Sequence, residues 1–206
     1  MTKIKICGIT RPEDAVLAAT LGADFLGMIF VPGSPRYLTA AQAAEIVRAV
    51  RENVQSPPRF VGVFRNAAPE TLRETAAVAG LDVLQLHGAE SEDDIRAAGL
   101  PVIKGLHVGD TLPPTDAHPS AEWLLFDTLH GQQSGGTGKR FDWQLLDPYP
   151  RTKPFLLAGG INPGNVADAI RVVRPDAIDL ASGVESAPGI KDHDTLRILF
   201  ERVRTP

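Results

Sequence analysis

Three side chains that can exchange protons stand at the ends of short apolar runs. Cys7 ends the first run, His87 ends the fourth and Asp127 ends the sixth. A thiol whose pKa is lowered by a nearby cation such as Lys5 can remove a carbon-bound proton, because the thiolate is the reactive form. A carboxyl group whose pKa is raised by burial can donate a proton. One acid and one base are what an isomerase needs.

Each of these residues also has a structural interpretation. Cys7 could be a small buried hydrophobe, Asp127 could cap the loop that follows it, and His87 could be a hydrogen-bonded histidine at a rim. Strand alternation would place Lys5 on the same face as Cys7, and Gln85 on the same face as His87. The residues alone leave both interpretations open.

Two glycine turns follow the last two apolar runs. Gly159-Gly160 and Ser182-Gly183 could be no more than tight turns, or their backbone N–H groups could bind a phosphate. Barrel proteins build such sites after their last strands with the N-terminus of a short helix, which the segment Glu185–Lys191 could supply.

Arg36 lies in the loop after the second run, where it could be a solvated charge or a bidentate clamp for a carboxylate. Asp179 lies on the opposite face from Ile178 and Leu180, so it is expected to point into the same mouth as the acid and the base. The Gly135–Lys139 segment lacks the GxxxxGK[ST] spacing of a phosphate loop and is predicted to be a flexible lid. No histidine or carboxylate group has metal-ligand spacing, so we expect no metal.

The elements that must position these groups can be recognised from periodicity. Eight runs predict strands, at Lys3–Cys7, Asp24–Phe30, Arg59–Phe64, Asp82–His87, Pro101–His107, Trp123–Asp127, Phe155–Ala158 and Asp176–Ala181. Helical periodicity is found in Arg11–Leu21, Ala40–Val50, Pro69–Ala79, Ser91–Ala98, Pro163–Val172 and His193–Val203. Suitable caps are Thr10, Thr39, Ser91, Asn162 and Asp192.

Alternating strands and helices favour parallel strands joined by crossovers. Eight units in 206 residues give roughly 25 residues each, which suits a closed barrel better than an open doubly wound sheet. We therefore predict an α/β fold, a single (β/α)₈ TIM barrel over residues 1–206. Pro113, Pro114 and Pro119 precede the sixth strand and cannot sit inside a regular helix, so the fifth helix is expected to be short or missing.

The composition argues against several classes of function. The formal net charge is −4 and both signs are interspersed, so no basic stripe is available for nucleic acid. The single cysteine rules out an intramolecular disulfide. The chain starts without a signal-peptide pattern and contains no apolar run of about 18 residues. We expect a cytoplasmic protein, a monomer or homodimer, that does not bind membranes and acts on a small phosphorylated molecule.

The motifs, taken in order, resemble those of the phosphoribosylanthranilate isomerase family of tryptophan biosynthesis. They are KICGIT (Lys5–Thr10), GADFLGMIF (Gly22–Phe30), SPRY (Ser34–Tyr37), VGVF (Val61–Phe64), QLHG (Gln85–Gly88), FDT (Phe126–Thr128), GGTGKRFDW (Gly135–Trp143), LAGGINPGNV (Leu157–Val166) and DLASGVESAPGIKD (Asp179–Asp192). The resemblance covers the whole chain. It implies a small (β/α)₈ barrel that works without cofactor or metal.

The reaction implied by the resemblance is an aldose–ketose isomerisation, the Amadori rearrangement of N-(5-phosphoribosyl)anthranilate to 1-(2-carboxyphenylamino)-1-deoxyribulose 5-phosphate. Asp127 would protonate the furanose ring oxygen, and Cys7 would take the proton from C2 of the Schiff base. The binding residues implied are Arg36 for the anthranilate carboxylate, Gly159, Gly160, Ser182 and Gly183 for the phosphate, and Lys5, His87 and Asp179 in the mouth.

Two other classes of function fit parts of the sequence. Another sugar-phosphate isomerase or epimerase barrel, or one that accepts two substrates, would share the phosphate site. Epimerases of that kind are typified by metal sites, and ribotide isomerases by a pair of catalytic aspartates, whereas the first run here ends in Cys7. A non-catalytic phosphate-ligand binding barrel could use Cys7 as an oxidisable thiol. Function that survives loss of Asp127 would support that alternative.

Overall fold

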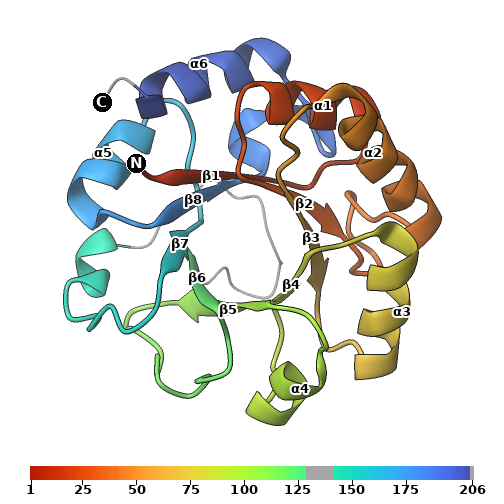
Figure 1. The fold of residues 1–206 in the computed structure, drawn as a ribbon. Helices are drawn as coiled ribbons and strands as arrows, with labels where there is room; N and C mark the ends of the chain where they lie inside the picture. Colours follow the sequence, from red (N-terminus) through yellow and green to blue (C-terminus); the bar gives the residue numbers. More distant parts are fainter. Residues whose placement is uncertain (129–141, 205–206) are drawn as a thin grey trace.

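Eight parallel strands close into a barrel (Figure 1). The structure is a computed structural model, which describes residues 1–128 and 142–204. The strands are β1 (Lys3–Cys7), β2 (Phe25–Ile29), β3 (Arg59–Phe64), β4 (Val83–Leu86), β5 (Val102–Val108), β6 (Trp123–Thr128), β7 (Phe155–Leu157) and β8 (Ala177–Leu180). Pairing of β8 with β1 closes the ring. The predicted barrel is confirmed, and every strand lies within one residue of its predicted ends.

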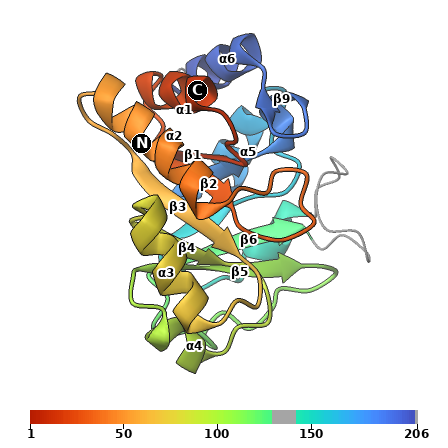
Figure 2. The same ribbon diagram turned by 90° about the vertical axis from the view of Figure 1, so that its right-hand side faces the viewer.

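The helices form an outer layer around the barrel (Figures 1 and 2). They are α1 (Pro12–Thr20), α2 (Ala40–Asn53), α3 (Pro69–Ala79), α4 (Glu92–Ala97), α5 (Val166–Val173) and α6 (His193–Arg204). Each amphipathic helix lays its apolar stripe on the strands. In α2, for example, Ala43, Ile46, Val47 and Val50 recur at helical spacing and are all buried.

The helix between β5 and β6 is missing, as the three prolines predicted. Residues 109–122, all of which are described, contain no helix. After β6, the described chain resumes at residue 142 with the short 3-10 helix η1 (Trp143–Leu146). The predicted lid at Gly135–Lys139 lies outside the described residues.

Three of the five predicted caps are confirmed. Thr39 and Gln42 form a capping box at α2, Ser91 and Asp94 form one at α4, and the Asp192 carboxylate accepts from the backbone N–H of Thr195 in α6.

The other two predicted caps are wrong. Arg11, which makes no side-chain cap bond, precedes α1, while the Thr10 hydroxyl donates instead to the carbonyl of Gly189. Asn165 rather than Asn162 stands at the start of α5.

The prediction of a short helix in Glu185–Lys191 is also wrong. This segment is a two-stranded antiparallel hairpin of β9 (Glu185–Ala187) and β10 (Ile190–Lys191). Pro188 fixes its own φ, and Gly189 adopts φ +81°, which together suit a tight turn rather than a helix. The single helical turn of this region lies earlier, in the 3-10 helix η2 (Ser182–Val184).

Apolar residues pack in two places, on either side of the strands. The larger cluster lies between the strands and the helices. The smaller one includes Phe25, Val61, Val83, Leu125 and Ala177, which share the inward face of their strands. Residues two positions further along this face reach the carboxyl ends of the strands, so the apolar layer is the floor on which the polar groups of the barrel mouth rest.

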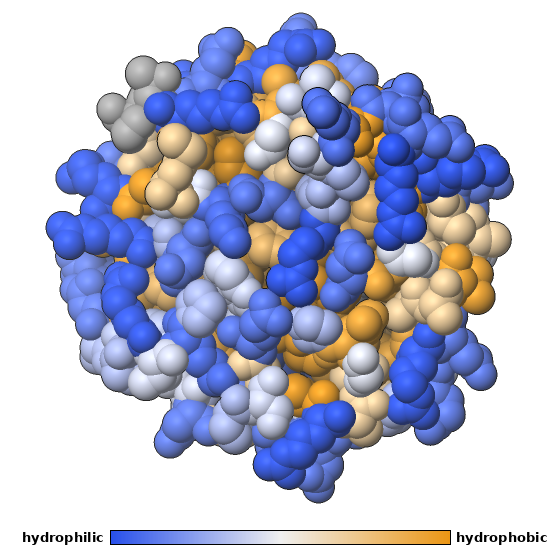
Figure 3. Space-filling view, in the orientation of Figure 1, coloured by the Kyte–Doolittle hydropathy of each residue, from blue (hydrophilic) through white to orange (hydrophobic). Residues whose placement is uncertain are grey.

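The surface carries mixed polar and apolar residues. Figure 3 shows a face that is mostly hydrophilic, with apolar patches between charged side chains. Among the described residues, no helix is long and apolar enough to cross a membrane.

Candidate active site

A pocket opens where the strands end. It is lined by residues at the carboxyl ends of the strands and in the turns that follow them: Cys7, Ile29, Arg36, Val63, Gln85, His87, Asp127, Ala158, Gly159, Gly160, Ile161, Asp179, Ala181, Ser182 and Gly183. Every site residue predicted from the sequence is in this set except Lys5, which is buried against Asp179. The fold therefore brings the predicted acid, base, arginine and glycine turns into one cavity.

Cys7 stands above a buried ion pair. Lys5 and Asp179 occupy the same register position on β1 and β8, and Lys5 Nζ donates to Asp179 Oδ1 at 2.9 Å. Gly27, the register partner of Cys7 on β2, leaves room for the thiol, since a Cβ there would lie 2.8 Å from Sγ. The sulfur is thus packed between two strands and close to a lysine.

Opposing effects act on the thiol. Burial raises the pKa of Cys7 above its usual 9.0, while the positive charges of Lys5 and Lys191 act to lower it. Burial of Lys5 would lower its own pKa, but the charges of Asp179 and Cys7 raise it overall, so Lys5 stays a cation. At neutral pH the free thiol is mostly protonated.

Asp127 has an acid–base character suited to proton donation. Burial, helped by the negative charge of Asp179, raises the pKa of Asp127 from 3.8 to about 6. A hydrogen bond of 2.8 Å from the backbone N–H of Thr128 to Oδ1 opposes the shift only in part. Asp127 therefore holds a proton in an appreciable fraction of molecules at neutral pH.

His87 is neutral in this pocket. Burial, together with the charges of His107 and Lys5, lowers its pKa to about 3. Its Nδ1 lies 2.9 Å from Gln85 Nε2, and its Nε2 lies 3.5 Å from Asp127 Oδ2. Gly105 on β5 makes room for the ring, because a Cβ there would approach the ring carbon Cγ to 2.9 Å.

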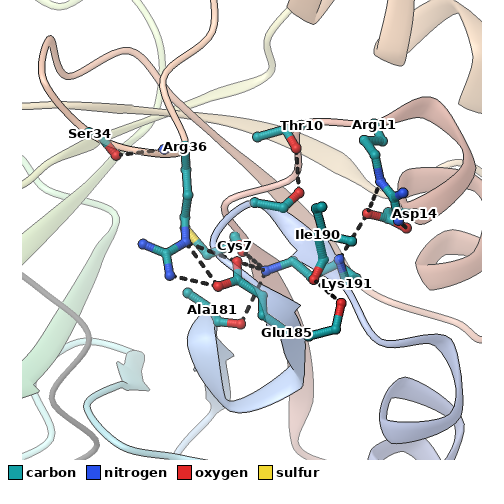
Figure 4. A network of polar contacts seen from close by, with 12 residues as sticks. Cys7, Thr10, Arg11, Asp14, Ser34, Arg36, Ala181, Glu185, Ile190 and Lys191 are labelled. Atoms are coloured by element: carbon teal, nitrogen blue, oxygen red, sulfur yellow. Dashed lines mark hydrogen bonds and ion pairs between the residues drawn. The ribbon is translucent and has the colours of Figure 1, made fainter.

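Arg36 reaches the pocket from the loop after β2, but it is not a free cation. Its guanidinium is hydrogen-bonded to Glu185, with Nη2 2.6 Å from Oε2 (Figure 4). Lys191 also binds Glu185, at 2.8 Å from Oε1. The three side chains join the loop after β2 to the β9–β10 hairpin.

The two glycine turns pack directly against each other. Gly159 and Gly160 both have positive φ, +85° and +68°. A Cβ on Gly183 would lie 2.0 Å from the carbonyl oxygen of Ile161, so only glycine allows this approach. Backbone N–H groups in such left-handed turns form concave sites that suit anions.

Residues 4–202 match the family described as N-(5'phosphoribosyl)anthranilate (PRA) isomerase. This range includes the predicted acid and base, Asp127 and Cys7, and both glycine turns. The chain belongs to the N-(5'-phosphoribosyl)anthranilate isomerase family. The resemblance inferred from the motifs is thereby confirmed.

Relatives within the N-(5'-phosphoribosyl)anthranilate isomerase family match end to end. The isomerase of Pseudomonas fluorescens (strain Pf0-1) is 45% identical over 203 residues, 97% of each protein. The crystal structure of the Thermus thermophilus enzyme has a TM-score of 0.88 at 40% identity and covers 99% of both chains. A relative solved in complex with reduced 1-(o-carboxyphenylamino)-1-deoxyribulose 5-phosphate has a TM-score of 0.82 at 34% identity, with 100% coverage of both chains.

Two buried lysines of this isomerase-family barrel were missed by the sequence reasoning. Lys104 in β5 binds Glu90 at 2.7 Å and the carbonyl of Gly88, and Lys191 binds Glu185. Both lysines are almost fully buried. A lysine in sequence is normally assigned to solvent, and only a buried acidic partner far along the chain changes that assignment.

One group of described residues has a metal-like arrangement. One ligand atom each from His87, His107 and Asp127 lies within 4.8 Å of the others. No spacing rule in the sequence indicated this group, because its members come from three different strand ends that only the barrel brings together. His107 was likewise not among the predicted site residues.

Proposed function

We propose that this chain catalyses the Amadori rearrangement of N-(5-phosphoribosyl)anthranilate to 1-(2-carboxyphenylamino)-1-deoxyribulose 5-phosphate, with Asp127 as general acid and Cys7 as general base. The observation that carries the proposal is a carboxyl group with a pKa of about 6 that faces the same pocket as a thiol in a chain of this isomerase family. The ligand of one solved relative is the reduced form of this product.

Asp127 performs the first step. Its carboxyl proton passes to the furanose ring oxygen, the bond from C1 to that oxygen breaks, and the nitrogen lone pair forms the C=N bond of a protonated Schiff base. With a pKa of about 6, about one Asp127 in ten carries a proton at pH 7. This fraction is about a hundredfold larger than for an aspartate with a pKa of about 3.9.

Cys7 performs the second step. Its thiolate takes the proton from C2, and the C2–H electrons form the C1=C2 bond of an enolamine while the nitrogen becomes neutral. Lys5 and Lys191 favour the thiolate, and the positive Schiff base beside the thiol would favour it further. The enolamine then gains a proton at C1 and loses its O2 proton, which gives the amino-ketose with no net change in protons.

The remaining predicted residues bind and orient the substrate. Arg36 contacts the anthranilate carboxylate, while the turns Gly159-Gly160 and Ser182-Gly183 hold the phosphate through backbone N–H groups. Asp179 keeps Lys5 charged beneath Cys7, and His87 presents a neutral ring beside Asp127. The first two proton transfers are assigned to side chains of this protein, while the tautomerisation of the enolamine and the return of Asp127 and Cys7 to their starting protonation states exchange protons with solvent water.

Product identification tests the proposal. Purified protein is incubated with freshly made N-(5-phosphoribosyl)anthranilate, and the product is trapped with borohydride, which reduces the ketone to a pair of epimeric alcohols. Chromatography with mass detection should then show both epimers of authentic reduced 1-(2-carboxyphenylamino)-1-deoxyribulose 5-phosphate, whereas reduction of unreacted substrate through its open-chain imine gives only the ribitol epimer. Unchanged substrate would refute the proposal.

The rival functions are tested in parallel. Turnover of an aminoimidazole-carboxamide ribotide substrate would indicate a two-substrate barrel, and an inert protein that still binds inorganic phosphate would indicate a binding barrel. We also expect a cytoplasmic protein that is either a monomer or a homodimer. Sedimentation of the purified protein will distinguish these two oligomeric states.

A further inference from the structure

Arg36 is held along one edge only. A guanidinium has a side edge, formed by Nε and Nη2, and an end edge, formed by Nη1 and Nη2, and each edge can receive a carboxylate. Nε donates to Glu185 at 2.9 Å from Oε1 and 3.2 Å from Oε2, and Nη2 donates to Oε2 at 2.6 Å. Nη1 points away from Glu185 and binds no described residue (Figure 4). The side edge is therefore occupied and the end edge is available.

Glu185 is itself fixed from below. Lys191 Nζ donates to Glu185 Oε1 at 2.8 Å and also to the carbonyls of Cys7 at 2.6 Å and Ala181 at 3.1 Å. The side chains of Glu185 and Lys191 are 4% and 0% exposed. Through this chain of contacts the guanidinium of Arg36 is tied to the ends of β1 and β8, the strands that carry the base and the phosphate turn.

The charges of the network leave one positive charge for a ligand. Arg36 is a cation and Glu185 is an anion, and Lys191 donates three hydrogen bonds as an ammonium group although burial lowers its pKa. The charges of Arg36 and Lys191 in turn lower the pKa of Glu185 against the opposing effect of burial. Without Glu185, two cations would face each other and Arg36 would lose the bonds that orient it. Gly8 leaves space for the arginine, because a Cβ there would lie 2.5 Å from Arg36 Cδ.

We propose that Glu185 is a positioning residue that holds Arg36 by its side edge, so that the end edge receives the carboxylate on the aromatic half of the substrate. Glu185 thereby sets the preference for a carboxylated aromatic amine. This inference rests on the proposed function, because it takes its ligand from that reaction.

Binding of two stable ligands tests the role of Glu185. One is reduced 1-(o-carboxyphenylamino)-1-deoxyribulose 5-phosphate, and the other is the same compound without the carboxyl group. Dissociation constants are measured by fluorescence titration for wild type, Glu185→Asp, Glu185→Gln and Glu90→Gln. The Glu90 variant is the matched control, because it removes an equally buried Lys–Glu pair that does not contact Arg36.

Wild type and Glu90→Gln should bind the carboxylated ligand roughly tenfold or more tightly than its counterpart, the value of a charge-assisted pair. Both Glu185 variants should lose that preference while their affinity for the ligand without a carboxyl group is unchanged. Preserved preference, or an equal loss for both ligands as a merely structural role would give, would overturn the inference. Equal binding of the two ligands by wild type would also overturn the inference about Glu185, together with the proposed contact of Arg36 with the carboxylate. The proposed reaction is tested separately, by the product assay.

A second inference concerns His87, His107 and Asp127. They come from the ends of β4, β5 and β6, and His107 and Asp127 are register partners. Their ligand atoms lie within 4.8 Å of one another. Two imidazoles and a carboxylate are a donor set that Zn²⁺ accepts. We propose that this cluster binds Zn²⁺ and that the bound ion inhibits the isomerase.

The chemistry of the site explains why inhibition follows. The contact of Gln85 Nε2 with His87 Nδ1 orients the ring, so that His87 Nε2 faces Asp127 Oδ2 at 3.5 Å. A carboxylate that binds the ion cannot carry a proton, so Asp127 would lose its ability to donate one. Binding of Zn²⁺ requires the three donor atoms to move closer to one another. His107 is an exposed residue at the rim of the barrel mouth.

Zinc titration of wild type, His107→Asn and Cys7→Ser by calorimetry, without substrate, tests binding apart from the proposed reaction. His107→Asn should bind Zn²⁺ about tenfold more weakly or worse, and Cys7→Ser should bind it as wild type does. Zn²⁺ should also inhibit wild type at concentrations that spare His107→Asn. Equal binding by His107→Asn and wild type would overturn the inference, and so would loss of binding in Cys7→Ser, because the thiol would then be the ligand.

Discussion

Replacement of Asp127 with asparagine should stabilise the protein even as it removes activity. The pKa of Asp127 is raised from 3.8 to about 6 by burial and by the charge of Asp179. A shift of about two units corresponds to about 3 kcal/mol, since each unit is worth about 1.4 kcal/mol. Asparagine has nearly the same shape and cannot ionise, so the variant avoids the cost of a buried charge.

The gain should depend on pH in a defined direction. Because the pKa of Asp127 is higher in the folded state, the folded protein binds the carboxyl proton more tightly than the unfolded chain does. The stability that this bound proton contributes is lost as the pH rises through 6. At pH 8 the free energy of unfolding of the Asp127→Asn variant should therefore be about 3 kcal/mol larger than that of wild type. At pH 5 the difference should be about half as large.

Urea denaturation followed by circular dichroism at pH 5 and pH 8 measures this difference. The control is Asp116→Asn, which replaces an exposed aspartate and should leave the free energy of unfolding within about 0.5 kcal/mol of wild type. A variant no more stable than wild type at pH 8, or a difference that shrinks as the pH rises, would refute the assignment of Asp127 as a buried acid with a raised pKa.

Two further predictions concern the catalysts and the phosphate turns. Asp127 has a pKa of about 6 and the pKa of Cys7 lies above 9.0, so kcat/KM should rise about tenfold per pH unit up to pH 6. It should then stay level to about pH 9, because the thiolate fraction grows while the protonated Asp127 fraction falls. A rate that peaks sharply near neutral pH in stopped-flow assays would contradict these roles. Gly183→Ala would push a methyl group against the Ile161 carbonyl, so it should lower the free energy of unfolding by about 1–3 kcal/mol. It should also weaken the binding of inorganic phosphate, measured by calorimetry. Unchanged phosphate affinity would show that this turn is not part of the phosphate site.

The framework of the barrel could be predicted from local patterns. Strand ends agreed within one residue because short β-branched runs bounded by turn residues are a strong local signal. The missing fifth helix followed from the prolines of Val108–Ala121, which lack the N–H that a helix needs. Strand alternation also placed Lys5 next to Cys7, since that relation depends only on positions two residues apart.

Relations between distant segments were not predictable. Thr10 has the composition of a cap, but its hydroxyl binds Gly189 on a hairpin that the sequence suggested was a helix. Arg36 was assigned either to solvent or to substrate, whereas the structure ties it to Glu185, 149 residues away. Glu185 and Lys191 become register partners only when the β9–β10 hairpin forms.

Burial of charge was the other source of error. Lys104 and Lys191 would each be assigned to the surface from sequence, because isolated buried lysines are rare. Each is buried with a glutamate and backbone carbonyls, and those partners lie at strand ends or in the segments that follow them, which the closed barrel brings together. The raised pKa of Asp127 likewise depends on burial, which no single residue type reveals.

The central claim is that Cys7 and Asp127 move protons in the isomerisation of N-(5-phosphoribosyl)anthranilate. The most direct measurement follows the change in anthranilate-type fluorescence when wild type, Cys7→Ser and Asp127→Asn receive fresh substrate, with circular dichroism to show that all three proteins are folded. We expect a rapid change with wild type and rates lower by about 10²–10⁴ with either variant, the range for loss of a general acid or base. An inert wild type would contradict the proposed reaction, and a fully active Cys7→Ser would contradict the thiol base.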